Sequence, residues 1–228
     1  MLSKSRQLAA QRAYSATIGR GARSLAVTGS SPKADASEFA FDIAAAGAAF
    51  GRRVLLVRAR NRDFAALEPA PLDANIDSVW AATRQDRQNL FEIVVPAGTA
   101  LHAVLNDGQR LPEAVAGWLD RFDAVVFDCP PYEATEPALY TPLTASATEA
   151  VILVTLPGAA ARAGMEEVMK WLTESGAVVS ALALNDRFNP TLAQEMVREA
   201  RRFERIAPWL VEFVTRRVAG WPAINMHR

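Results

Sequence analysis

The chain has 228 residues, half of them apolar, which is enough to bury one substantial core. Its one cysteine, Cys129, excludes an internal disulfide framework, and two distant histidines without companion cysteines favour no metal cluster. The formal net charge is zero, but residues 1–24 carry five basic and no acidic side chains, and residues 196–228 carry seven arginines against three glutamates. Basic ends favour docking to an acidic partner or an anionic membrane surface, with solvated helix faces as the alternative.

Residues 1–22 are basic and lack the apolar region of a secretory signal, so they predict a basic N-terminal helix or arm. An organellar transit peptide is the alternative on composition. Residues 23–228 then form a single domain with a basic helical C-terminal end. No basic patch is interleaved with aromatic residues, and we therefore expect no nucleic-acid partner.

Short apolar, β-branched runs recur along the chain and predict strands that are buried on both faces. These runs are Ser24–Thr28, Arg53–Val57, Phe91–Val95, Ala124–Phe127, Val151–Thr155 and Val178–Leu184. Helical segments lie between them: Ser37–Phe50, stopped by Gly51, then Glu113–Leu119, and a third with an apolar stripe at Met165, Val168, Met169 and Leu172. The alternation predicts an α/β fold of three layers, with a mostly parallel central sheet and helices on both faces.

Two further segments are predicted outside this alternation. Residues 67–76 are polar and contain prolines, which predicts a surface loop. A capping box at Thr191 and Gln194 predicts a helix to about residue 206, and Pro208 can begin another over 209–218. We expect the apolar stripes of these helices to pack in a core, with contact to a partner or a membrane surface as the alternative.

The stretch "LAVTGSSPKADASEFAFDIA" has the layout of a phosphate-binding loop, in which a strand, a small polar turn and a helix follow one another. Such a loop ends G-K-[ST], but here the corresponding residues are Asp35, Ala36 and Ser37. Asp35 places a negative charge where phosphate would lie. The residues that could line a degenerate nucleotide site here are Thr28, Ser30, Ser31, Lys33 and Ser37.

The second strand ends with Arg58 and Arg60, where nucleotide hydrolases of this architecture carry acidic residues. Two arginines repel a cation, but they could hold a phosphate or a partner carboxylate. The alternative is a surface ion pair with Asp63 or Glu68.

The fourth strand ends "FDAVVFDCPP", and Asp128 is its candidate magnesium ligand. Its alternative role is hydrogen bonding in the turn at Pro130 and Pro131. Cys129 is expected to be a buried neighbour rather than a nucleophile. No residue is assigned a catalytic role, apart from Asp128 if the protein is active; Asp128 and Ser37 would be metal ligands only if Mg-nucleotide binds.

The stretch "SLAVTGSSPKADASEFAFDIAAAGAAFGRRVLLVRARNR", together with "VVPAGTALHAVLND" and "RFDAVVFDCPP", resembles the bacterial tyrosine autokinases of capsule and exopolysaccharide synthesis. These belong to the wider partition and septum-site group of P-loop ATPases. The resemblance covers about residues 23–189 and implies a P-loop NTPase-like fold. It also implies that Asn185 lies near the adenine base of a bound nucleotide.

The departures from this family decide the expected function. The loop lysine is replaced by Ala36, two acidic positions are arginines, and the tyrosine-rich C-terminal tail is missing, since no tyrosine follows Tyr140. Tyr132 and Tyr140 are expected to pack in loops. We therefore expect a degenerate pseudokinase, an accessory or regulatory protein of bacterial exopolysaccharide, capsule or holdfast synthesis or export.

The expected partners are a membrane polysaccharide co-polymerase that regulates chain length, or an active paralogue, with a homo-oligomer as a further option. The resemblance implies a cytoplasmic protein, peripheral at the inner membrane through a partner or its basic terminal helices. No cofactor is expected, and Mg-ATP is the alternative. Two other functions stay open: an active ATPase or kinase with Lys33 or Lys4 in place of the loop lysine, and an anion sensor that uses Arg58 and Arg60.

Overall fold

The structure is a computed structural model that describes residues 4–60, 73–96, 98–131, 139–157, 159–185 and 200. The chain divides into two compact units, Met1–Leu184 and Asn185–Arg228. Residues 67–72 of the predicted loop, the predicted helix at 209–218 and all of the predicted helix at 191–206 except Ala200 lie outside the described residues. Within the described ranges, no helix combines the length and the apolar character that crossing a membrane requires.

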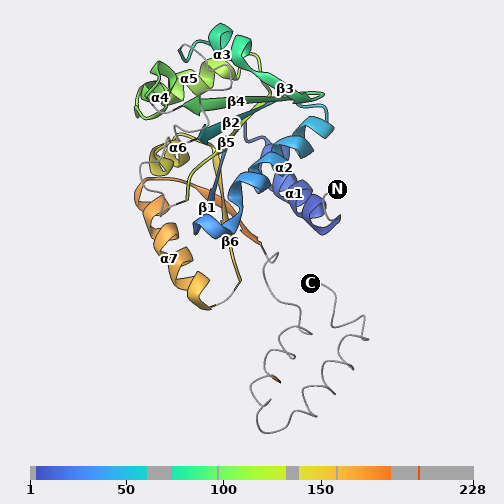
Figure 1. Cartoon of the computed structure of the whole chain (residues 1–228), viewed down its shortest axis with the longest axis vertical. Coiled ribbons are helices and arrows are strands. Elements are labelled where there is room, and N and C mark those ends of the chain that lie inside the picture. Colours follow the sequence, from blue (N-terminus) through green and yellow to red (C-terminus); the bar gives the residue numbers. More distant parts are fainter. Residues whose placement is uncertain are drawn as a thin grey trace. The chain divides into compact units, whose positions relative to one another are not determined.

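A seven-stranded sheet forms the centre of the first unit, in the order β3-β4-β2-β5-β1-β6-β7 (Figure 1). All neighbouring strands run parallel except β3, which pairs antiparallel with β4 at one edge. The strands are β1 (Ser24–Gly29), β2 (Val54–Arg60), β3 (Arg84–Arg87), β4 (Leu90–Pro96), β5 (Ala124–Asp128), β6 (Ala150–Thr155) and β7 (Val179–Leu184).

All six strands expected from the apolar runs are confirmed within one residue at each end, except that β2 continues three residues beyond the expected end at Val57. The sequence analysis missed β3, whose four residues, Arg84–Arg87, are polar and exposed. This strand forms through main-chain pairing with β4 and buries no apolar side chain, so apolar patterning carries no signal for it.

Helices cover both faces of the sheet and confirm the three-layer α/β prediction (Figure 1). Helices α1 (Lys4–Ala16) and α2 (Ala36–Ala49) pack on one face, and their side chains share one buried core cluster. The other cluster contains side chains from α3 (Ile76–Ala82), α4 (Ala100–Leu105), α5 (Arg110–Trp118), α6 (Thr141–Ser146) and α7 (Ala159–Glu174). Short 3₁₀ turns follow α1 at Ile18–Arg20 and β1 at Pro32–Ala34.

The details of two predicted helices are confirmed. Gly51 follows α2 with a φ of +83°, and its N–H donates to the carbonyl of Ala48 at 3.0 Å, as expected of a glycine that ends a helix. On α7, Val168 and Leu172 of the predicted stripe are fully buried, and Met165 and Met169 pack against the same core.

The basic N-terminal helix expected over 1–22 forms as α1 and runs beside α2 in the same direction. Arg6, in the first turn of α1, contacts Asp42 in the second turn of α2, and Tyr14, in the last turn of α1, stacks on Phe50 just after α2 with ring centroids 5.1 Å apart. At both points the two contacting residues are 36 positions apart in the sequence, so the helices run parallel with a constant register along their length. Glycine at position 47 allows the close approach, because a Cβ there would lie 3.2 Å from the Tyr14 ring.

Candidate functional site

The candidate site lies at the carboxyl ends of the parallel strands, where the chain leaves β1, β2, β5 and β6. The loop from Gly29 to Asp35 connects β1 to α2 there. Asp35 has φ 57° and ψ 37°, the left-handed conformation that a glycine adopts without strain. Aspartate tolerates this conformation better than most residues. The backbone of this loop therefore keeps a shape suited to glycine, although its side chain is acidic.

Small apolar side chains fill the inside of this loop. Ala34 is fully buried and Ala36 is nearly so. The N–H of Ala34 donates to the carbonyl of Ser31 at 3.0 Å, which closes the turn on itself. A Cβ at Gly29 would lie 2.9 Å from the Ser31 carbonyl oxygen and 3.1 Å from the Ala34 Cβ. Both alanines also belong to the buried core cluster that α1 and α2 share.

Hydroxyl groups fasten the loop to the neighbouring strands. The Ser30 hydroxyl donates to Thr155 Oγ1 at 2.9 Å, and the Ser30 N–H donates to the carbonyl of Val154 at 2.8 Å. The Thr28 hydroxyl donates to the carbonyl of Pro130 at 2.8 Å, and Thr141 donates to the same carbonyl at 2.7 Å. Thr28 and Ser30, both candidate nucleotide ligands, therefore use their hydroxyl protons within the protein.

The remaining candidates in this region differ in exposure. Lys33 and Ser37 are exposed, Ser31 is half-buried, and Asn185 is half-buried just after β7. Lys33 belongs to the 3₁₀ turn between β1 and α2. Whether any of them contacts a nucleotide stays a prediction.

Asp128 ends β5 in a buried position, and its Cα pairs in register with Val27 of β1 and Arg58 of β2. Ala124 and Val126 of the same strand face α1 and α2, and the alternation of the strand places Asp128 on that face too. Cys129 follows it and is buried, as expected. Burial, and secondarily the Asp128 carboxylate, raise the pKa of the Cys129 thiol, so it stays protonated and is a poor nucleophile.

Arg58 lies on the α2 side of the sheet and is largely buried. Its Nε lies 3.1 Å from Glu92 Oε1 of β4, at an angle unsuited to a hydrogen bond, so the contact is an ion pair by proximity. Its guanidinium also lies 5.3 Å from the ring centroid of Phe41 on α2, and the guanidinium of Arg87 lies at the same distance. Among the described residues, the ion-pair partner of Arg58 is Glu92. The alternative partners Asp63 and Glu68, and the side chain of Arg60, lie outside the described residues.

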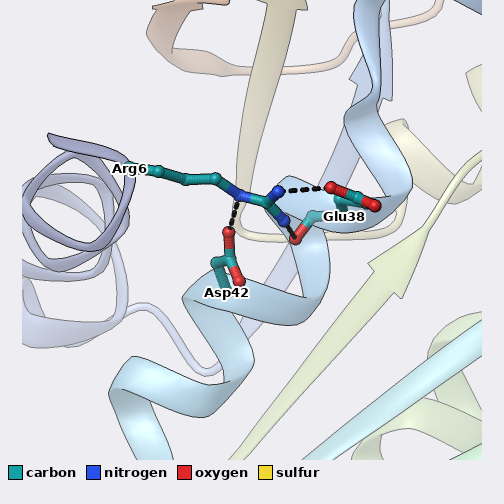
Figure 2. Close-up of polar contacts among 3 residues, drawn as sticks. All are labelled: Arg6, Glu38 and Asp42. Carbon is teal, nitrogen blue, oxygen red and sulfur yellow. Dashed lines mark hydrogen bonds and ion pairs between the residues drawn. The ribbon is translucent and has the colours of Figure 1, made fainter. Parts of the chain in front are cut away.

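A cluster that the sequence analysis did not identify joins α1 to α2 (Figure 2). Arg6 of α1 forms ion pairs with Glu38 and Asp42, and its Nη2 donates to the Glu38 carbonyl at 3.1 Å. The Asp42 side chain is 2% exposed, and among the described residues its Oδ1 has no hydrogen-bond partner. Burial raises the pKa of Asp42, which the hydrogen bond and charge of Arg6 partly offset. The sequence signal that could have identified this cluster is the acidic pair at i and i+4 on an otherwise apolar helix face. Such a pair predicts a cation nearby, because buried carboxylates need one.

No protein-family model matches the chain, and no curated protein matches it. Among solved structures it is similar to the BceF tyrosine kinase domain, with 24% identity over 78% of this chain and 74% of that chain and a TM-score of 0.55. It is also similar to the VpsO kinase domain, with 16% identity over 79% and 94% of the two chains and a TM-score of 0.59. A third is the septum site-determining protein MinD of Pyrococcus horikoshii, complexed with Mg-ADP, with 16% identity over 72% and 70% and a TM-score of 0.54.

This chain has the fold of these kinase and ATPase domains. The similarity confirms the P-loop NTPase-like α/β architecture expected from the sequence. At these identities it establishes the fold alone, since one fold supports many activities.

Proposed function

We propose that this chain is a catalytically degenerate relative of the bacterial tyrosine autokinases. In this proposal it acts as a cytoplasmic accessory or regulatory partner in the synthesis or export of an exopolysaccharide, a capsule or a holdfast. The observation that carries the proposal is the loop between β1 and α2, which has Asp35 at its glycine position and Ala36 at its lysine position.

The physical support comes from charge and packing together. A phosphate loop needs converging N–H groups and a lysine that neutralises the β- and γ-phosphates. Here the loop interior holds Ala34 and Ala36, and a carboxylate begins α2. Losing one positioned charge of this kind costs several kcal/mol of transition-state stabilisation, about 3–4 by analogy with other positioned donors. Asp128 alone cannot replace it, because a magnesium ligand needs the nucleotide that the lysine helps to hold.

The fold then serves as a docking platform. The proposed partner is the cytoplasmic part of a membrane polysaccharide co-polymerase, or an active paralogue, and the protein would be peripheral at the inner membrane through that contact. The support is the resemblance in sequence and the fold shared with tyrosine kinase domains.

An active Mg-nucleotide enzyme is the second candidate, favoured by Asp128 at the end of β5 and by the fold shared with MinD, which is complexed with Mg-ADP. An anion sensor at Arg58 and Arg60 has less support, because Arg58 is already paired with Glu92.

Isothermal titration of the purified full-length chain with millimolar Mg-ATP separates the first two candidates. We expect no saturable heat. Saturable binding that the isosteric Asp128→Asn variant abolishes would instead support the enzyme candidate.

Complementation tests the biological role. In a strain that lacks the gene, we expect both the wild-type chain and Asp128→Asn to restore polysaccharide secretion, at protein levels matched by immunoblot. Restoration by the wild type alone would show that the carboxylate is needed and would refute a purely structural role. Unchanged secretion in the deletion strain would refute the proposed pathway.

A further inference from the structure

Helix α1 is attached to α2 in two zones of different chemistry. The C-terminal zone is apolar: Ala10, Ala13 and Tyr14 are buried, and Tyr14 stacks on Phe50. The N-terminal zone is ionic, because Gln7, Leu8 and Ala9 are exposed and Arg6 makes the ion pairs with α2 (Figure 2). The ionic zone can therefore open while the apolar zone stays packed.

Among the side chains that the structure describes, the ionic zone holds two carboxylates and one guanidinium. Arg6 bridges Glu38, which is half-exposed, and Asp42, which is almost fully buried. The remaining charge that acts on Asp42 belongs to Arg87 of β3, whose side chain is itself more than half exposed and ion-paired with Asp86. Two carboxylates that share one cation carry an excess negative charge, which favours uptake of a proton by the more buried of them.

The second oxygen of Asp42 strengthens this preference. Asp42 Oδ1 is buried and has no hydrogen-bond partner in the described part of the chain, so the ionised form is poorly solvated when α1 is closed. Opening of the ionic zone would admit water to this oxygen. A group that is harder to ionise in the closed state links closure to proton binding.

We propose that the N-terminal half of α1 is a proton-coupled strap on α2, which closes more tightly when Asp42 takes up a proton and loosens as the pH rises. When open, it uncovers an acidic pair, Glu38 and Asp42, within two turns of the loop that ends at Asp35. Burial, the largest cause, raises the pKa of Asp42 above that of a free aspartate and agrees with this direction, although the hydrogen bond and the charge of Arg6 act the other way. The sign is opposite to that of a simple salt-bridge latch, which acid would loosen. The strap depends on α1 and α2 alone and does not rest on the proposed function.

Hydrogen exchange of the full-length chain between about pH 5 and pH 8 tests the strap, with protection factors corrected for the intrinsic rate at each pH. In the wild type, protection of the amides around Arg6 should fall as pH rises, by about tenfold for each unit by which closure raises the Asp42 pKa. Protection around Tyr14 should stay constant.

The neutral variant Asp42→Asn separates the two mechanisms. The strap predicts that this variant protects the first turns of α1 at pH 8 at least as well as the wild type does at pH 5, with no remaining pH dependence. A simple salt bridge predicts the reverse, a loss of protection at pH 8. Glu38→Gln, which removes the competing carboxylate, should keep the chain folded and move the wild-type transition to lower pH.

Arg12→Ala is the matched control, because Arg12 is an exposed arginine of the same helix. It should leave the protection profile unchanged. Wild-type protection that is constant with pH, or that falls in acid, would overturn the proposal, as would loosening of α1 by Asp42→Asn.

Discussion

Removing the guanidinium of Arg6 should destabilise the protein through the charge that it leaves behind. In Arg6→Ala, the Asp42 carboxylate, 2% exposed, would lose its ion pair and its hydrogen bond with Arg6, and its Oδ1 already has no hydrogen-bond partner within the described ranges. Breaking a fully buried pair costs about 3–5 kcal/mol. Arg6 is 27% exposed and Glu38 54% exposed, so water replaces part of the lost interaction and the expected cost is about 2–3 kcal/mol at pH 8.

The cost should depend on pH in a defined direction. The folded-state pKa of Asp42 is raised in the wild type, so this group favours the folded state below its unfolded pKa, and the advantage is lost as the pH rises through the folded value. Without Arg6 the pKa of Asp42 rises further. The two proteins therefore differ most above both folded pKa values, and the difference shrinks as the pH falls and both become protonated.

Urea unfolding at pH 8 and pH 5 measures this, with Arg12→Ala as the control for loss of an exposed arginine. A cost of about 2–3 kcal/mol corresponds to a fall in Tm of roughly 5–10 °C for a domain of this size. The double variant Arg6→Ala/Asp42→Asn should recover most of the loss, since no unpaired charge remains. A change below about 0.5 kcal/mol in Arg6→Ala, or a cost that grows in acid, would refute the reasoning.

Three further outcomes are expected. In Gly47→Val the added side chain meets the Tyr14 ring, so we expect a loss of about 1–3 kcal/mol in urea unfolding, whereas an unchanged midpoint would contradict the close helix approach. Trp118→Phe removes the bond from the indole N–H to the Ala74 carbonyl, 2.9 Å long, and should cost about 1–2 kcal/mol by the same assay; a neutral effect would mean that water replaces the indole. Cys129 is buried and its thiol pKa is raised, so alkylation by iodoacetamide at pH 8 should proceed only as fast as the protein opens, and rapid labelling of folded protein would argue against that burial.

The local sequence was sufficient to predict those strands and helices that bury apolar side chains of their own. The six apolar runs became strands because continuous β-branched segments suit a sheet covered on both faces. Gly51 ended α2 because it adopts a positive φ at no steric cost. By contrast, β3 formed from four exposed polar residues, since main-chain pairing with β4 has no signature in side-chain pattern.

The candidate site was predictable in its location but not in its contacts. Parallel strands bring their carboxyl ends to one edge, so the loop after β1, Arg58 and Asp128 could be placed together from the sequence. The replacement of lysine and glycine by Ala36 and Asp35 was also visible there. That Thr28 and Ser30 donate their hydroxyl protons to Pro130 and Thr155 was not, because these partners lie more than 100 residues away.

The sequence by itself determined the alternation of strands and helices, the buried runs and the loss of the phosphate-loop residues, because these depend on residue type and on spacing along the chain. Only the tertiary structure decided the charge partners. It paired Arg58 with Glu92 of β4, and it joined Arg6 of the N-terminal helix to Asp42 of α2. Ion pairs form between side chains that the fold brings within a few ångströms, and over 36 residues that distance is set by how α1 packs on α2.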